Sequence, residues 1–295
     1  MLDGVSIIGE LINHSFARAR RAWEARSLEQ YQELARLQKG RGARFLTVNI
    51  QGTSQLSVRW DELAEFLVRL VPALQESVDL PLSFDSSDIE YHRIALEAYD
   101  RWKANGEAPV VNSLSSSRAR LDDWLALVRE EDTRVMVMAS EGFGPGGESA
   151  PNTTAARVHE TAKWFVKRLL SDGGRRPDQI IVDPGLCPVA ADVEGRTAVT
   201  LDSLALMSRD PDLRGVHYSI GLTNFSYGLP RDLRLAVENA LLVLAQRAGL
   251  DTFLGNAAGP LGRQVRLYLN GGTGVFTDVT ATDLPALADA TADVA

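Results

Sequence analysis

The sequence has one cysteine, Cys187, among 295 residues. A single thiol excludes a disulfide framework and a metal site built from several cysteines. The first apolar run is short and ends at Glu10, which is the pattern of neither a signal peptide nor a membrane span. We therefore expect a cytoplasmic protein that does not enter the membrane.

Basic residues are outnumbered, with 31 Lys and Arg against 39 Asp and Glu, and the net charge is −8. The densest basic cluster, Arg18, Arg20 and Arg21, has no interleaved aromatic residues of the kind that bind single-stranded nucleic acid. We therefore expect no nucleic-acid partner. A small anionic ligand held by a few local cations stays compatible with the sequence.

Several catalytic motifs are missing. There is no G-x-G-x-x-G after the first predicted strand, no G-x-S-x-G, no H-E-x-x-H and no lysine at a predicted strand end. The glycine-rich segment 142–147 lacks the Lys-Ser/Thr of a P-loop, which favours a mobile lid or a plain turn. His14 and His217 are isolated, so structural roles are favoured and no metal site is expected.

Strand-like and helix-like segments alternate along a chain that is 45% hydrophobic and 24% charged. Eight units of about 35 residues predict a single-domain α/β fold, a (β/α)8 TIM barrel over residues 1–275, with an open doubly wound sheet as the alternative. Residues 276–295, rich in Ala and Thr, predict a weak helix or a disordered tail. The predicted strands are 5–9, 45–48, 82–84, 109–111, 134–138, 180–182, 216–222 and 252–254, and the predicted helices are 28–39, 61–76, 89–102, 121–129, 154–170, 201–207 and 231–247.

The clearest strand is Ile180-Ile181-Val182, followed by Asp183 and then by Pro184-Gly185, which stop the strand. One acid after one strand is most simply a cap or a turn residue. The pattern recurs, however, and a barrel gathers its strand ends at one face. The polar residues at or near predicted strand ends are Glu10, Asn13, Asn49, Asp85, Asn112, Asp183, Asn224 and Asn256.

These carboxylates and carboxamides suit a flat heterocycle with several N–H donors and a ring carbonyl. A carboxylate accepts two parallel hydrogen bonds, and an amide both donates and accepts. Two alternatives stay open at this point. Asn49 and Asn256 could be turn residues, and Glu10 could form an ion pair with an arginine inside the barrel mouth.

The segments 7–13, 46–49, 84–86, 111–113, 182–184 and 221–226 resemble, in order, the motifs of the pterin-binding barrels. The resemblance covers roughly residues 5–260 and is closest to the methyltetrahydrofolate:corrinoid methyltransferases, including the folate-binding domain of cobalamin-dependent methionine synthase. Dihydropteroate synthase shares this fold, and residues 13–16 are similar to its first motif. Its Ser-x-Arg signature and its strand-end lysine have no counterpart, which argues against that activity.

The resemblance implies transfer of the N5-methyl group between 5-methyltetrahydrofolate and a corrinoid carried by a partner protein, and it is compatible with a homodimer. Asp85, Asn112 and Asp183 would hold the pyrimidine edge of the pterin, and Asn224 would hydrogen-bond near N5. The proton that N5 needs would come through an amide and water network around Asn224 and Asp183. Glu10, Asn13 and Asn49 would complete the shell around the ring.

Two positions depart from the family pattern. Thr47 stands where the family usually has an aspartate, and Ala139 where close relatives commonly carry an acid. Losing an acid from the pterin shell costs about 1–3 kcal/mol if nothing compensates. Two other functions therefore stay open: the same barrel acting on another folate, such as methylenetetrahydrofolate, or on a non-corrinoid acceptor, and a non-catalytic folate-binding protein.

Overall fold

The computed structural model describes residues 4–256, 268–270 and 276–278. Its main sheet has eight strands in the order β10-β1-β2-β3-β4-β5-β8-β9, and all neighbouring pairs within it are parallel. The strands are β1 (Ser6–Asn13), β2 (Ala43–Asn49), β3 (Leu82–Asp85), β4 (Val110–Leu114), β5 (Arg134–Met138), β8 (Ile180–Asp183), β9 (His217–Tyr218) and β10 (Thr252–Gly255).

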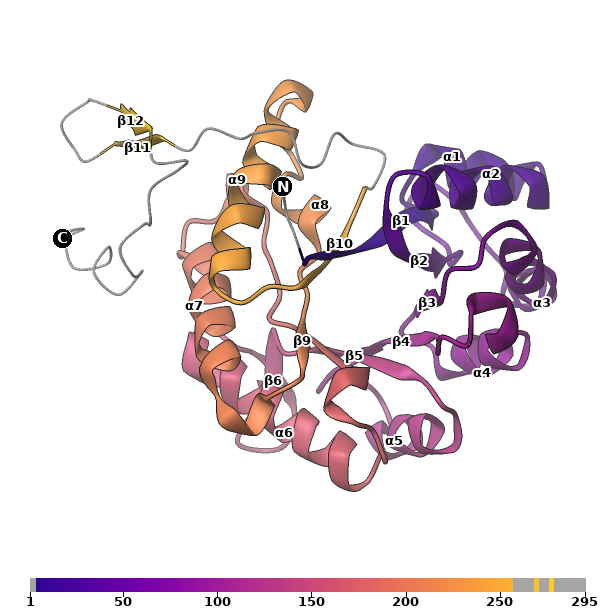
Figure 1. Cartoon of the computed structure of the whole chain (residues 1–295). Helices are drawn as coiled ribbons and strands as arrows, with labels where there is room; N and C mark the ends of the chain where they lie inside the picture. Colours follow the sequence, from indigo (N-terminus) through magenta and orange to yellow (C-terminus); the bar gives the residue numbers. More distant parts are fainter. Residues whose placement is uncertain (1–3, 257–267, 271–275, 279–295) are drawn as a thin grey trace.

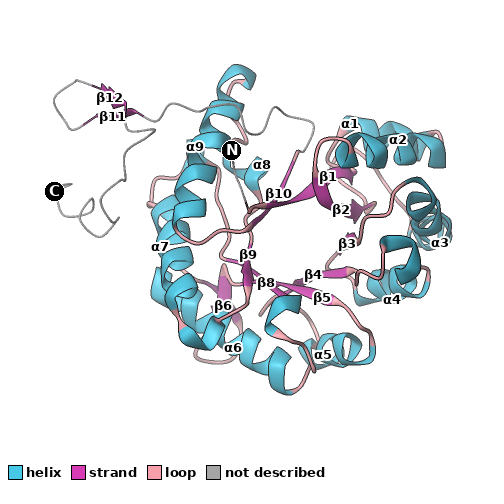
Figure 2. Ribbon diagram, in the orientation of Figure 1, coloured by secondary structure: helices cyan, strands magenta, loops and turns pink. Residues whose placement is uncertain are grey.

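The sheet closes on itself between β9 and β10. The N–H of Leu254 donates to the carbonyl of Ile220 at 2.9 Å, and a parallel bridge pairs Gly221 with Leu254. The helices surround the ring of strands (Figure 1), and the secondary-structure view shows the same two layers (Figure 2). The predicted (β/α)8 barrel is confirmed, and the open sheet is wrong.

The helices are amphipathic and cover the outside of the barrel. In α2, for example, the Ser27 side chain accepts a hydrogen bond from the Gln30 N–H at the first turn, and one face buries Tyr31, Leu34 and Ala35. The helices are α1 (Ala17–Glu24), α2 (Leu28–Lys39), α3 (Trp60–Ser77), α4 (Ile89–Glu97), α5 (Leu121–Glu130), α6 (Ala155–Ser171), α7 (Arg196–Arg209), α8 (Leu222–Phe225) and α9 (Arg231–Arg247). Single turns of 3₁₀ helix lie at η1 (Arg101–Ala104), η2 (Pro177–Gln179), η3 (Val189–Ala191) and η4 (Pro211–Leu213).

The inside of the barrel has an apolar layer below a polar one. Strand side chains alternate between faces, so residues two positions after a member of the apolar layer also point inward. The polar layer therefore lies nearer the carboxyl ends of the strands. The apolar layer consists of Ile8, Phe45, Val110, Met136, Ile181 and Leu254. The next inward positions, all polar except Met138, are Glu10, Thr47, Asn112, Met138, Asp183 and Asn256.

Several boundaries differ from the predictions. Helices 28–39 and 231–247 and strand 134–138 match the structure, whereas helix α1 was not predicted, because its eight residues bury only Ala19, Ala22 and Trp23. Strand β1 continues to Asn13. Helix α4 ends at Glu97, before the separate turn η1. Strand β9 keeps only two of the predicted residues 216–222, since the chain turns into α8 at Leu222.

The glycine-rich segment is the turn of a β-hairpin, in which β6 (Glu141–Phe143) pairs with β7 (Ser149–Pro151). The Gly144 N–H donates to the Glu148 carbonyl at 2.7 Å, which fits the plain-turn alternative. In the predicted tail, β12 (Phe276–Asp278) pairs with β11 (Tyr268–Asn270), and the other tail residues lie outside the described part. No helix in the described ranges is long and apolar enough to cross a membrane.

Candidate active site

The structure brings the predicted polar residues to one rim of the barrel. Asn13, Asn49, Asp85 and Asp183 are the last residues of β1, β2, β3 and β8, and Asn112 is the third residue of β4. Asn13 is in register with Asn49, and Asp85 with Asn112. Because the strands are parallel, all five lie at the carboxyl end, where barrels of this type place their active sites.

Asp183 and Asn224 line the same cavity, which has a volume of about 320 Å³. Asn224 is exposed and lies on the single turn of α8, two residues beyond the point at which the predicted strand gives way to helix. Met138 and Arg196 also line the cavity. Its lining therefore combines one carboxylate, two carboxamides, several apolar side chains and one guanidinium.

Asp183 is only 6% exposed. Its carboxylate accepts a hydrogen bond of 2.7 Å from the Gly185 N–H, but burial outweighs this contact and raises its pKa to about 7. A side chain at residue 185 would collide with Ser140, and the backbone φ of +85° there favours glycine. Gly185 thus fixes the one hydrogen bond that the Asp183 carboxylate receives from the described protein.

Glu10 is equally buried, at 6% exposed. Its carboxylate accepts a hydrogen bond from the Thr223 hydroxyl on α8. Its pKa rises to about 7 because burial outweighs the opposing Thr223 hydrogen bond, and the negative charges of Glu238 and Asp85 raise it further. Glu10 forms no ion pair with any described arginine, so the ion-pair alternative considered above is wrong.

Asp85 and Asn49 contact each other directly, because the Asn49 amide donates to the Asp85 carboxylate at 3.3 Å. Burial raises the pKa of Asp85, and the Asn49 hydrogen bond and then the guanidinium of Arg118 oppose that shift. Arg118 is half-buried on the loop after β4 and donates to the Ser113 carbonyl at 2.8 Å. The sequence analysis missed it, because no strand-end pattern marks a residue in the middle of a loop.

The rim amides differ in how far the protein already uses them. The Asn13 side chain accepts a hydrogen bond from the Ser15 N–H at 2.8 Å, and that of Asn49 accepts one from the Gln51 N–H at 3.3 Å, so both shape local turns. The Asn112 side chain, 5% exposed, has no hydrogen bond to the described protein. Its donor and its acceptor are therefore both available to a ligand.

Both departures from the family pattern are buried. The Thr47 hydroxyl has no hydrogen-bond partner in the described part of the chain. Ala139 is fully buried, and its carbonyl accepts a hydrogen bond of 2.9 Å from the Asn152 side chain, which also donates to the Thr161 hydroxyl. Asn152 lines the cavity beside Asp183, and the sequence analysis missed it.

The two predicted structural histidines have protein partners. His14 is bonded to the Tyr31 hydroxyl and the Gln51 carbonyl, and burial lowers its pKa to about 4. His217 contacts Asp251 at 2.7 Å and is the first residue of β9, at the amino end of that strand. Within the described ranges, no group of three or more His, Cys, Asp and Glu is placed to hold a metal ion.

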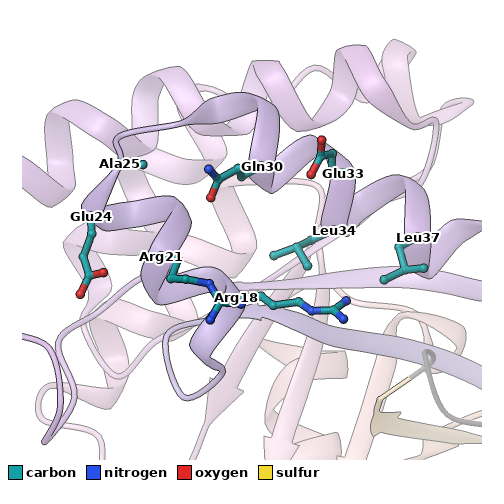
Figure 3. Close-up of a pocket in the computed structure, with 8 residues that line it drawn as sticks. All are labelled: Arg18, Arg21, Glu24, Ala25, Gln30, Glu33, Leu34 and Leu37. Carbon is teal, nitrogen blue, oxygen red and sulfur yellow. The ribbon is translucent and has the colours of Figure 1, made fainter.

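A second pocket lies outside the barrel between α1 and α2 (Figure 3). Arg18 and Arg21 line it together with Glu24 and Glu33, so it carries both signs of charge. None of its residues lines the Asp183 cavity, and none is one of the predicted strand-end residues. The predicted site therefore coincides with the barrel mouth and not with this groove.

Comparison with known proteins shows the family to which the chain belongs. The sequence model of the pterin binding enzyme family matches residues 10–254. The chain belongs to this family. It is 26% identical over 248 residues to methylcorrinoid:tetrahydrofolate methyltransferase of Eubacterium limosum, covering 83% of each protein. It is also 24% identical over 266 residues to methionine synthase of Mycobacterium tuberculosis, where the match covers 86% of this chain but only 20% of the synthase.

Solved structures share the fold. Dihydropteroate synthase of Xanthomonas albilineans superimposes with a TM-score of 0.58 at 20% identity, and the match covers 88% of this chain and 90% of the synthase. The Yersinia pestis enzyme gives a TM-score of 0.60 at 16% identity, with the same coverage of both chains. At this identity the likeness concerns the barrel alone, and the predicted family resemblance is confirmed by the family match.

Proposed function

We propose that this pterin-binding barrel is a methyltransferase that moves the N5-methyl group between 5-methyltetrahydrofolate and a corrinoid protein. The observation that carries the proposal is the cavity shared by Asp183 and Asn224, in which a buried carboxylate that forms no ion pair with a described cation lies together with an exposed carboxamide. The similarity to a methylcorrinoid:tetrahydrofolate methyltransferase along most of both chains supports the same reaction.

The residues divide into binding and chemical roles. Asp183, Asp85 and Asn112 hold the pyrimidine edge, because carboxylates accept paired N–H bonds and the Asn112 amide has both of its groups available. Glu10, Asn13 and Asn49 complete the shell around the ring. N–H donors from the pterin favour the ionised form of Asp183, which offsets part of the cost of burying it.

Asn224 acts at N5. A tertiary amine is a very poor leaving group, so N5 must gain a proton or a strong hydrogen bond before a nucleophile takes its methyl group. Asn224 stabilises that protonated state from the cavity wall. The nucleophile, a cobalt(I) corrinoid on the partner protein, reaches the methyl group over the carboxyl rim. A cytoplasmic location and a homodimer belong to the same proposal.

The test is a titration of the protein with methyl-, methylene- and unsubstituted tetrahydrofolate, alongside Asp183→Ala and Asn224→Ala. We expect Asp183→Ala to weaken binding by about 10- to 100-fold, because it removes a charged acceptor from a buried site. Asn224→Ala should keep the binding but lose methyl transfer to a corrinoid acceptor. If the unmodified protein binds none of the three folates, the proposal is wrong.

The second candidate is the same barrel acting on another folate, such as methylenetetrahydrofolate, or on an acceptor other than a corrinoid. Buried Thr47 and Ala139 favour it, because each leaves an uncharged side chain where the family pattern has an acid. Tighter binding of methylenetetrahydrofolate than of methyltetrahydrofolate would select this candidate. Binding without turnover for any acceptor would instead indicate a non-catalytic folate-binding protein.

A further inference from the structure

We infer that Glu10 stores the proton that N5 receives and delivers it through the Thr223 hydroxyl. This inference rests on the proposed methyl transfer and identifies the proton donor that the reaction requires. It starts from one contact. Thr223 bonds to Glu10, which lies 213 positions earlier in the sequence, and Thr223 directly precedes Asn224, the residue on the cavity wall.

The contact links two parts of the site that differ in access to solvent. Glu10 is buried inside the barrel on β1, Thr223 is half-buried on α8, and Asn224 is exposed. A hydroxyl both donates and accepts, so Thr223 can receive a proton on one side and release one on the other. In the structure the Thr223 hydroxyl donates to Glu10, and when Glu10 is protonated the same contact can run from the carboxyl group to the hydroxyl oxygen. The two side chains therefore link a buried carboxyl group to α8, whose next residue, Asn224, lines the cavity.

Burial and two neighbouring acids favour the protonated form of Glu10, and together they outweigh the Thr223 hydrogen bond, which favours the carboxylate. The titratable groups that face it are Glu238 on α9 and Asp85 on β3, both acids, and no described cation pairs with it. Glu238 is itself half-buried, is bonded to the Ser226 hydroxyl, and has a raised pKa. A carboxyl group between two acids in a low-dielectric site holds its proton into the neutral range, where a general acid is most effective.

The step conserves protons and electrons. The Glu10 carboxyl gives its proton to the Thr223 oxygen while Thr223 releases its own hydroxyl proton toward N5, where Asn224 stabilises the resulting ammonium group. When the methyl group leaves to the cobalt(I) nucleophile, the electron pair of the C–N bond stays on N5. Glu10 is left as a carboxylate and regains a proton from water. In the proposed binding mode Asp183 is bonded to the pyrimidine edge and is therefore not the acid at N5.

The experiment compares the unmodified protein with Glu10→Gln, Thr223→Val and Thr223→Ser, with Glu238→Gln as the matched carboxyl control. Two quantities are measured between about pH 5.5 and 8.5: the affinity for 5-methyltetrahydrofolate and the single-turnover rate of methyl transfer to free cob(I)alamin. The unmodified rate should fall as the pH rises through about 7, the pKa of Glu10.

Glu10→Gln should lower the rate at pH 6 by about 100-fold and remove this inflection. Folate affinity should change less than about threefold, because glutamine keeps a hydrogen-bonding group of the same size in the shell around the ring. Thr223→Val should behave in the same way, and Thr223→Ser should restore the rate. Glu238→Gln should keep the rate at pH 6 and shift the inflection to lower pH, because it removes a negative charge near Glu10.

An infrared titration provides a readout that does not depend on turnover. In Asp183→Asn, a carboxylic acid C=O band should titrate near pH 7 and should disappear when Glu10→Gln is added. A missing band, or an inflection that persists unchanged in Glu10→Gln, overturns the inference while methyl transfer stands. If the unmodified protein binds no folate or transfers no methyl group, the proposed function fails, and the inference fails with it.

Discussion

At the scale of single residues, the mouth of the barrel is a set of buried acids with few positive charges. Glu10 and Asp183 are each 6% exposed, and both have a pKa of about 7. Among these acids, Asp85 is the one whose raised pKa is opposed by the charge of Arg118. The buried carboxylates of such a site lack hydrogen-bond donors until a ligand brings N–H groups. A heterocycle with N–H donors therefore fits this site, and an anionic ring does not.

Thr47 provides a test at this scale, because its buried hydroxyl has no described partner, whereas the Thr161 hydroxyl accepts a bond from Asn152. We expect Thr47→Val to change the free energy of unfolding by less than about 0.5 kcal/mol, and Thr161→Val to lower it by about 1–2 kcal/mol, since only the second leaves a buried donor unpaired. Urea denaturation measures both. A larger loss in Thr47→Val would show that its hydroxyl is hydrogen-bonded in solution.

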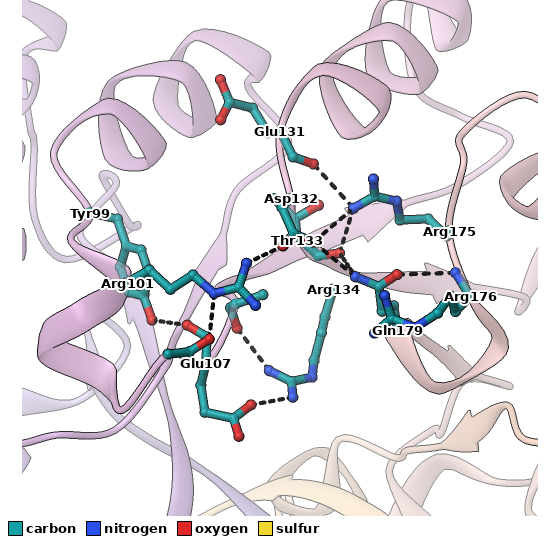
Figure 4. A network of polar contacts seen from close by, with 12 residues as sticks. Tyr99, Arg101, Glu107, Glu131, Asp132, Thr133, Arg134, Arg175, Arg176 and Gln179 are labelled. Atoms are coloured by element: carbon teal, nitrogen blue, oxygen red, sulfur yellow. Dashed lines mark hydrogen bonds and ion pairs between the residues drawn. The ribbon is translucent and has the colours of Figure 1, made fainter.

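At the scale of elements, the two ends of the barrel have different roles, the candidate site at one and a structural polar network at the other. The carboxyl ends of the strands carry the acids and amides of the candidate site. Near the amino ends of β5 and β8, a polar network ties the loops together (Figure 4). There Arg175, only 8% exposed at its side chain, donates to the carbonyls of Glu131 and Thr133 at 3.1 and 2.9 Å, and Arg134 forms an ion pair with Glu107.

We expect Arg175→Ala to lower the free energy of unfolding by about 3 kcal/mol, because it leaves two carbonyls without a charged donor in a mostly buried place. The matched control is Arg176→Ala. Arg176 pairs with Asp178 on the surface, where both side chains are more than half exposed, so its loss should cost no more than about 0.5 kcal/mol. Chemical denaturation measures both variants. Folate affinity should be unchanged in either folded variant, and a selective loss in Arg175→Ala would contradict this division of the barrel.

At the scale of the whole molecule, the buried acids couple stability to pH. Their ordinary pKa values are 4.5 for Glu10 and 3.8 for Asp183, and both rise to about 7 in the folded state. Between these limits the two acids bind more protons in the folded protein than in the unfolded chain, so their contribution to the free energy of unfolding falls as the pH rises. His14 and His92, whose pKa values burial lowers to about 4, act in the opposite direction below about pH 6.5. The pKa of Asp210 is lowered from 3.8 to about 2, so this residue changes the free energy of unfolding only below about pH 4.

We therefore expect the ligand-free protein to lose about 1–2 kcal/mol of stability between pH 6.5 and pH 8, with a lower melting temperature at pH 8, because above about pH 6.5 the two buried histidines are neutral in both states and the two acids alone remain. Thermal unfolding across this range measures the loss. The double variant Glu10→Gln, Asp183→Asn should show a much flatter dependence. A melting temperature of the unmodified protein that rises toward pH 8 would contradict the raised pKa values.

The sequence by itself determined the alternation of strands and helices and the polar residues at the strand ends. Both depend on local patterns, such as the β-branched run before Asp183 or the helical spacing of Tyr31, Leu34 and Ala35. Such patterns are visible among neighbouring residues and need no knowledge of distant contacts. The same patterns failed at α1 and β9, where a short, weakly apolar helix and a two-residue strand depend on what packs against them.

The tertiary structure alone decided which of these residues meet and in what protonation state. Glu10 and Thr223 lie 213 positions apart, and only the closure of β10 beside β1 and β9 brings them together. Arg118 and Asn152 joined the site through folded loops that no periodic pattern marks. The raised pKa values of Glu10 and Asp183 follow from burial, and burial is the sum of contributions from elements far apart in the chain.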